Sequence, residues 1–276
     1  MLRLLHIEFI KLWNNTVSKV LIIAYFFLLT SIALIAAIKF PIGDGILLAD
    51  IGIFNFPYIW HFNTWVAAFF KLFLAIVIVS MMANEYSNKT IKQNLIDGLS
   101  KKEFVLSKFL TVISFSLIST VFVFIVSLIL GLSYSDYNEA SAIFSDLEFI
   151  FAFFVKLMAF FSFCLFLGIL VKRSAFALGF LILWYFVEQI IYGLLGWKIT
   201  GWETAQSIKN IFPLESMQNL INEPTRRLDA IQAIGTQIGT DFSYDYYVHW
   251  YEVAIALAWT AIFIYSSFAL LKKRDL

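Results

Sequence analysis

The chain has 276 residues, of which 61% are hydrophobic, 18% are aromatic and 14% are charged, and its formal net charge is +1. Soluble domains carry about 25% charged residues, and a soluble chain of this length could not hide so much apolar surface from water. We therefore predict a polytopic membrane protein. The small net charge provides no large basic surface, so we expect no nucleic-acid partner.

The single cysteine, Cys164, lies in an apolar run, and the three histidines are far apart in the sequence. One cysteine cannot form a disulfide within the chain, and no neighbouring residues complete a zinc site. We therefore expect Cys164 to be a packing residue and the chain to bind no metal.

Six segments are long and apolar enough to cross about 30 Å of hydrocarbon as helices of about 20 residues. These predicted spans are residues 20–38, 62–83, 109–131, 149–171, 175–195 and 250–271. We expect an all-α fold that forms one transmembrane domain over residues 1–276. Because the number of spans is even, both termini lie on the same side of the membrane.

Basic residues are enriched in the cytoplasmic loops of membrane proteins. If both termini are cytoplasmic, the short segments on that side hold 13 of the 20 basic residues but only five of the 19 acidic residues. These basic residues are Arg3, Lys11, Lys19, Lys89, Lys92, Lys101, Lys102, Lys108, Lys172, Arg173, Lys272, Lys273 and Arg274. We therefore predict a multi-pass protein of the inner, cytoplasmic membrane with both termini in the cytoplasm.

The first 15 residues have an amphipathic pattern at helical spacing. Their apolar face consists of Leu2, Leu5, Phe9, Leu12 and Trp13. Such a segment fits a helix that lies in the membrane interface. A plain lead-in to the first span fits equally well.

The longest segment between predicted spans is residues 196–249, on the outer side. Two stretches within it, "ETAQSIKNIF" and "EPTRRLDAIQAIG", have helical spacing, and Pro224 in the second suits a first helical turn. We expect two short outer helices there.

Residues 84–108, "NEYSNKTIKQNLIDGLSKKEFVLSK", form a polar island between two apolar runs. Thr90 followed by Gln93 fits a capping box, in which each side chain binds a free backbone amide of the other. Gly98 suits the left-handed residue that ends a helix. Ser100 followed by Glu103 is a second capping box, so we expect a short helix, a break, and a new helix that enters the third span.

The short helix of the island carries Ile91 and Leu95 on one face, with Lys92 pointing elsewhere. An apolar ridge flanked by lysines is suited to a groove on another protein. A helix that rests on lipid headgroups is the alternative.

The island resembles the corresponding segment of the permeases of the type 2 ABC export family. The matching residues are Glu85, Tyr86, Thr90, Lys92, Leu95, Gly98, Ser100 and Lys108. The sequence departs from the pattern at Asn88, where glycine is usual, and at Lys101, where arginine is common. The resemblance implies six spans, an interfacial N-terminal helix and a short cytoplasmic coupling helix that binds an ATP-binding subunit.

The resemblance predicts a membrane-spanning subunit of an ABC exporter that pairs with a second permease copy or a paralogue. The residues expected to bind the ATP-binding subunit are Glu85, Tyr86, Thr90, Ile91, Lys92, Leu95 and Gly98. The sequence has no G-x-x-x-x-G-K-[ST] loop. We therefore expect no enzymatic activity and no bound cofactor in this chain, with ATP and Mg²⁺ held by the partner subunit.

Two other classes of membrane protein are alternatives to the exporter. A membrane anchor or immunity-type protein that does not transport could bind a soluble partner through the same island. A secondary transporter is disfavoured because the sequence shows no inverted repeat and no broken-helix pattern.

Three charged residues, Lys71, Lys156 and Glu188, interrupt the apolar spans at similar depths in the outer half of the membrane. A charge in the membrane is expensive and needs a partner. We expect Glu188 to pair with Lys156, Lys71 or both. Such a pair could line the pathway or serve only the structure.

Overall fold

The structure is a computed structural model that describes residues 2–36, 52–137, 139–199, 201–228 and 245–274. Every regular element within these residues is helical. The described part of the chain therefore confirms the predicted all-α class.

The described residues form a series of helices. In chain order they are α1 (Leu2–Asn14), α2 (Thr16–Ala36), α3 (Tyr58–Phe69), α4 (Lys71–Ser87), α5 (Thr90–Ile96), α6 (Lys101–Tyr134), α7 (Ala140–Ile143), α8 (Glu148–Val171), α9 (Ser174–Leu194), a π-helical turn (Leu195–Ile199), α10 (Trp202–Lys209), α11 (Pro213–Asn219), a 3₁₀ turn (Thr225–Arg227) and α13 (Trp250–Lys273).

Four continuous stretches of the described residues are long and apolar enough to cross a membrane, or six if each of two bent helix pairs counts as one span. The four contain α6, α8, α9 and α13, and the bent pairs are α1 with α2 and α3 with α4. The chain is therefore a multi-pass membrane protein. The predicted spans overlap α2, the α3–α4 pair, α6, α8, α9 and α13, although residues 37 and 38 lie outside the described residues.

A sharp bend separates α1 from α2, which meet at 93°. The side chain of Asn15 accepts a hydrogen bond from the backbone amide of Ser18 at 3.0 Å. This contact caps the start of α2 and satisfies one of the amides that a new helix leaves free. The first residues thus form a separate helix rather than a straight extension of α2.

The predicted second span, residues 62–83, is not one straight helix. α3 and α4 are bent by 45° at Phe70. The amide of Phe70 binds the carbonyl of Ala67, and the amide of Phe73 binds the carbonyl of Phe70, both at 3.1 Å. These bonds span three residues instead of four, which tightens the chain at the break and makes Lys71 the first residue of α4.

The bundle is built around α8, which packs against α13, α4, α6 and α3. Phe153, Phe161 and Phe163 of this helix are fully buried. A Cβ atom at Gly168 would lie 2.9 Å from Cβ of Met82, so glycine allows α8 to approach α4 closely. The expected packing role of Cys164 is confirmed by its complete burial in the same helix.

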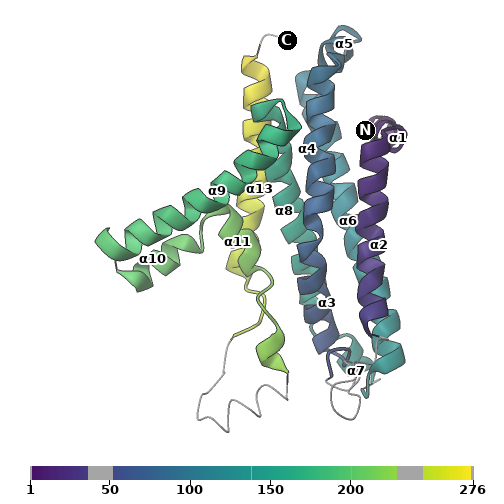
Figure 1. The fold of residues 1–276 in the computed structure, drawn as a ribbon, viewed down its shortest axis with the longest axis vertical. Coiled ribbons are helices and arrows are strands. Elements are labelled where there is room, and N and C mark those ends of the chain that lie inside the picture. Colours follow the sequence, from purple (N-terminus) through teal and green to yellow (C-terminus); the bar gives the residue numbers. More distant parts are fainter. Residues whose placement is uncertain (1, 37–51, 138, 200, 229–244, 275–276) are drawn as a thin grey trace.

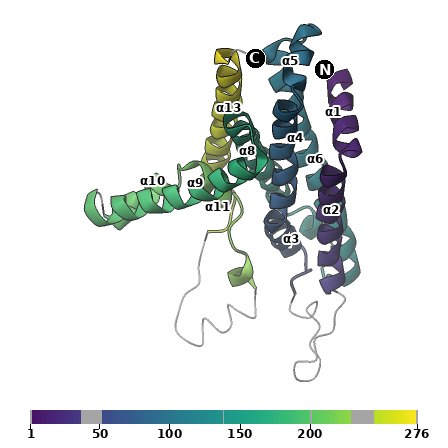
Figure 2. The same ribbon diagram turned by 45° about the horizontal axis from the view of Figure 1, so that its top comes forward.

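The bundle has two distinct ends (Figure 1). α1, α5 and the C-terminal end of α13 lie at one end, which we call the α5 end, and α7 lies at the other. α9 leaves the bundle sideways, and α10 lies beside it; the tilted view in Figure 2 shows the same arrangement.

The predicted helices of residues 196–249 are partly confirmed. α10 lies where "ETAQSIKNIF" was expected to be helical. After Pro224, however, only a 3₁₀ turn forms, and residues 229–244 lie outside the described residues. The unpredicted helix is α11, whose Pro213 occupies the first turn and therefore gave the same signal that was assigned to Pro224.

Candidate functional site

The short helix of the island, α5, does not begin as its sequence predicted. Its N-cap is Lys89, in the left-handed conformation with φ 55°, and no side chain caps it. The capping box of Thr90 and Gln93 is therefore wrong. The helix begins one residue earlier than predicted, so Thr90 is its first helical residue rather than its cap. The hydroxyl of Thr90 donates to the carboxylate of Glu85.

The end of α5 agrees with the prediction. Gly98 has φ +97°, the left-handed conformation that favours glycine. Its amide binds the carbonyl of Leu95 at 3.2 Å, and the amide of Leu99 binds the carbonyl of Asn94 at 3.0 Å. This pair of bonds is the Schellman motif, which satisfies carbonyls that the helix end leaves free.

The next helix begins where the second capping box was predicted. The side chain of Ser100 accepts from the amide of Glu103 at 3.2 Å, and the carboxylate of Glu103 accepts from the amide of Ser100 at 3.0 Å. α6 therefore starts afresh after α5, and the two helices are separated by a short fixed turn.

The apolar face of α5, which was predicted to bind a partner, faces the bundle instead. Ile91 is only 2% exposed, and Leu95 and Leu99 pack partly buried against the hydrophobic core. The apolar ridge therefore faces the bundle and is not available to a partner. Lys92 is exposed, and Ile96 is 75% exposed, so these two side chains mark the outer face.

A buried charge cluster lies directly beneath α5. The amine of Lys108 on α6 is 2.6 Å from a carboxylate oxygen of Glu8 on α1 and 2.6 Å from one of Glu85 on α4. Lys11 adds a second cation, 2.9 Å from Glu85 and 3.8 Å from Glu8. Two carboxylates and two amines thus join α1, α4 and α6, and Thr90 joins α5 to the same cluster.

Burial makes the charged members of this cluster depend on one another. The Lys108 side chain is 0% exposed, and those of Glu8 and Glu85 are 6% and 5% exposed. A buried charge is tolerated only when it is paired and hydrogen-bonded. The helix ends that meet here are consequently held in one arrangement. We call the five residues that join them, Glu8, Lys11, Glu85, Thr90 and Lys108, the Glu85–Lys108 cluster.

Three members of this cluster, Glu8, Lys11 and Lys108, were not among the predicted site residues. Glu8 is placed among apolar residues of α1, with Leu5 and Leu12 at positions i−3 and i+4 on the same face. A carboxylate on the buried face of an amphipathic helix requires a cation on the helix that covers it. The position of Glu8 on this face thus indicated a buried carboxylate, and the family pattern included Lys108. Nothing in the sequence indicated that these two residues bind each other.

Tyr86 lies in a second polar contact at the same end. Its hydroxyl accepts from Arg274 at 3.0 Å, and Arg274 also donates to the carbonyls of Ile169 and Leu170 at the end of α8. Lys101 of α6 donates to the carbonyl of Arg274 at 2.9 Å. The ends of α4, α6, α8 and α13 are therefore linked beside α5.

The predicted pairing of Glu188 with a lysine is wrong, because no described lysine lies within salt-bridge distance of it. Its carboxylate accepts from the indole N–H of Trp184 at 2.8 Å and from the amides of Leu214 and Glu215 at 3.0 and 3.3 Å. Those amides are free donors in the first turn of α11, and a helix N-terminus favours a negative charge. Glu188 therefore holds the start of α11.

Lys156 binds the opposite end of the same helix. Its amine donates to the carbonyls of Gln218 and Ile221 at 3.1 and 3.4 Å, and the residue is only 3% exposed. Carbonyls at a helix C-terminus favour a cation. Two of the three intramembrane charges thus fix α11 against α8 and α9, which sequence depth alone could not reveal.

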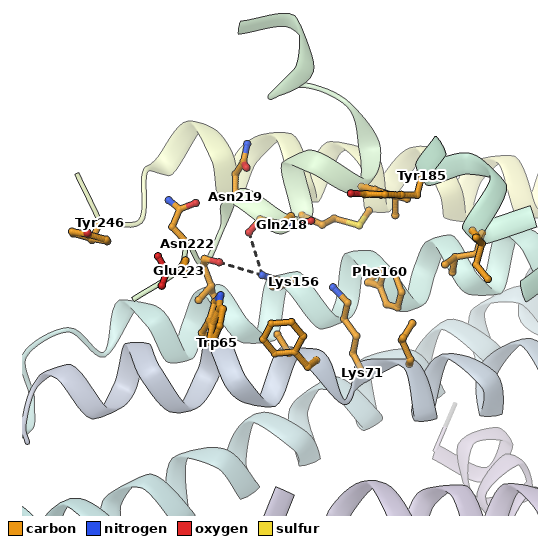
Figure 3. A pocket seen from close by; sticks show the side chains of 18 of the residues that line it. Trp65, Lys71, Lys156, Phe160, Tyr185, Gln218, Asn219, Asn222, Glu223 and Tyr246 are labelled. Carbon is orange, nitrogen blue, oxygen red and sulfur yellow. Dashed lines mark hydrogen bonds between the residues drawn. The ribbon is translucent and has the colours of Figure 1, made fainter. Parts of the chain in front are cut away.

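Lys71 faces a cavity of about 730 Å³. The described residues place no carboxylate within salt-bridge distance of its amine, and its contact is the ring of Phe160, 4.5 Å from the amine to the ring centroid. Figure 3 shows the amino ends of Lys71 and Lys156 pointing into this cavity, below α11. Lys71 and Lys156 therefore line one cavity, as their similar predicted depth allows, whereas Glu188 is not among its described lining residues.

Comparison with known proteins agrees with this architecture. A family model described as "ABC-2 family transporter protein" matches residues 35–276, from the end of α2 to the end of the chain. A comparison with curated proteins found no match. The match covers the island, the intramembrane charges and all the helices from α3 onward. The chain belongs to the ABC-2 transporter family and is a membrane subunit of an ABC transporter.

Proposed function

We propose that this chain forms part of an export pathway and that α5 is the coupling helix that binds a separate ATP-binding subunit. In this proposal the α5 end, with both termini, faces the cytoplasm. The partner binds ATP and Mg²⁺, and the present chain catalyses no reaction. Closure of the ATP-binding subunits moves α5, and the movement passes into the spans.

The observation that carries this proposal is the way α5 is attached. Its inner face is fixed by burial of Ile91 and by the bond from Thr90 to Glu85, which in turn binds Lys108. A force on α5 therefore reaches α4 and α6 through short, buried contacts. Its outer face, with Lys92 and Ile96, has no such contacts in the described chain and is suited to a partner.

The burial of Ile91 changes which substitution tests partner binding. A change at Ile91 or Leu95 would disturb the fold, so Ile96→Asp is the informative variant. Central apolar contacts of an interface commonly contribute more than 1 kcal/mol, so Ile96→Asp is expected to weaken binding about tenfold. Phe144→Asp is the matched control, because Phe144 is 66% exposed and follows α7 at the opposite end.

The measurement is co-purification of the ATP-binding subunit with each variant from membranes. Wild type and Phe144→Asp are expected to retain the subunit, whereas Ile96→Asp should lose most of it. Equal retention by all three would contradict docking on α5. Binding alone also suits a non-transporting anchor, so ATP-driven export by the reconstituted complex separates the exporter from that alternative.

The proposal includes a second permease. α9 leaves the bundle, and its apolar residues Phe176, Phe186 and Ile190 are 64%, 57% and 61% exposed. A lone six-helix unit offers little room for a lumen, so a pathway between two copies fits better. The mass of the detergent-solubilised complex tests this arrangement: two permeases per complex support it, and one contradicts it.

A further inference from the structure

We propose that the cavity at Lys71 binds an anionic amphiphile, with its negative group at Lys71 and its apolar part along the cavity wall. As a statement about transported cargo, this inference rests on the proposed function. As a statement about binding, it rests only on the cavity. A carboxylate, sulfate or phosphate headgroup would satisfy the same chemistry.

The cavity has the size of a ligand site. Its volume of about 730 Å³ lies within the range of about 300–1,000 Å³ that is usual for small-molecule sites. It opens where α3 and α4 bend, and α8, α9 and α11 complete its walls. The break at Phe70 thus places the first residue of α4, Lys71, directly at the cavity.

Lys71 differs from the other two intramembrane charges in what it contacts. Glu188 and Lys156 are each satisfied by one end of α11. Lys71 has the face of Phe160 at 4.5 Å and, among the described residues, no carboxylate within 4 Å. A cation in an apolar span requires a partner, and an aromatic face replaces only part of its hydration. The cavity leaves room for an anion to supply the rest.

The charge of the lining favours an anion. Among the described residues, three basic side chains line the cavity, namely Lys71, Lys156 and Arg226, and one acidic side chain does, that of Glu223. The Glu223 carboxylate accepts a hydrogen bond from Thr225. Lys71 and Lys156 line the same cavity, so a bound anion would be attracted by both amines.

The wall beside Lys71 is apolar. It includes Trp65, Phe69, Leu72, Leu181 and Ile182, of which Phe69 is 60% and Leu72 is 51% exposed. An aliphatic or aromatic group can lie along these side chains while its charged end reaches Lys71. A small inorganic anion would leave this surface uncovered, so the geometry points to an amphiphile.

The test uses photoreactive probes with one 12-carbon chain and three headgroups: a carboxylate, an amine and an uncharged alcohol. Each carries a diazirine on the chain and is added to the complete transporter in phosphatidylcholine nanodiscs, and labelled peptides are identified by mass spectrometry. The proteins are wild type, Lys71→Met, Lys71→Arg and Lys198→Met. Lys198 is an exposed lysine outside the cavity, so its variant controls for loss of a positive charge.

The carboxylate is expected to label peptides of the cavity wall more strongly than the amine or the alcohol. Lys71→Met should weaken this labelling about tenfold to a hundredfold, the usual effect of losing one charged hydrogen bond. Lys71→Arg and Lys198→Met should retain it. Equal labelling by all three probes, or undiminished labelling of Lys71→Met, would overturn the inference.

Two further arms identify the source of the anion. Competition by added phosphatidylglycerol would assign the site to a membrane lipid, whereas stimulated ATP hydrolysis without such competition would assign it to cargo. Both results retain the anionic amphiphile. If the ATP-binding subunit never co-purifies but the headgroup preference persists, the proposed function fails and the site remains. If the complex forms without any headgroup preference, only this inference fails.

Discussion

Lys108→Met removes the central cation of the Glu85–Lys108 cluster while keeping a side chain of similar length. In the wild type the Lys108 amine lies 2.6 Å from a carboxylate oxygen of Glu8 and 2.6 Å from one of Glu85. At an effective dielectric constant of about 20, each attraction amounts to about 6 kcal/mol before desolvation is counted. Because Glu8 and Glu85 would remain buried with less compensation, we expect the free energy of unfolding to fall by about 3–5 kcal/mol.

Reversible unfolding in mixed micelles with increasing sodium dodecyl sulfate measures this change. Lys102→Met is the matched control, because Lys102 is an exposed lysine of the same helix, and its effect should stay within about 0.5 kcal/mol. The double variant with Glu8→Gln should lose less stability than the sum of the single variants, since the two residues share one contact. If Lys108→Met were no more destabilising than Lys102→Met, the cluster would not hold the helices together.

Three local predictions follow from the same contacts. Glu188→Ala leaves two amides at the start of α11 without their acceptor, so faster amide hydrogen exchange in α11 and a loss of about 1–3 kcal/mol are expected; unchanged exchange would contradict its role. A Cβ atom at Gly98 would meet no neighbouring atom within 4 Å, but alanine would have to keep φ +97°. Gly98→Ala should therefore lower the free energy of unfolding by about 1–2 kcal/mol through backbone strain alone. Gly179→Ala, in an open helical position, is the control and should not lower it. Ser100→Ala removes a cap and should lower unfolding free energy by about 1 kcal/mol; no loss in a thermal unfolding assay would count against the cap.

The sequence was sufficient where one short segment determines the structure. The end of α5 at Gly98 and the start of α6 at Ser100 are local backbone features, and each has a residue type that only a few conformations favour. Long apolar helices were equally accessible, because the hydrocarbon thickness sets their length. Local rules failed at Thr90, because the helix begins one residue earlier, after Lys89, and leaves Thr90 inside its first turn.

The charges inside the spans show where sequence reasoning stops. Their depth indicated that Lys71, Lys156 and Glu188 lie in one region, and Lys71 and Lys156 do share a cavity. Their partners could not be inferred, because Glu188 and Lys156 bind the two ends of α11, a helix that returns to the bundle from a segment predicted to lie outside it. Opposite charges at similar depth were therefore not evidence of a pair.

The face of α5 required the tertiary structure as well. The spacing of Ile91 and Leu95 correctly identified an apolar ridge, but a ridge can face its own bundle or another protein. Ile91 is buried against the core, and Ile96 is the exposed apolar residue. Helical periodicity defines which residues share a face, whereas packing decides what that face contacts.

Site-specific cross-linking from α5 tests the central claim most directly. Ile96→Cys places an accessible thiol on the outer face of the helix, and the native Cys164 is buried and does not compete. Phe144→Cys places a thiol at the opposite end. We predict that a short maleimide cross-linker joins Ile96→Cys to the ATP-binding subunit and leaves Phe144→Cys unlinked. Cross-linking from Phe144→Cys, or a co-purified subunit that Ile96→Cys never reaches, would contradict the assignment of α5 as the coupling helix.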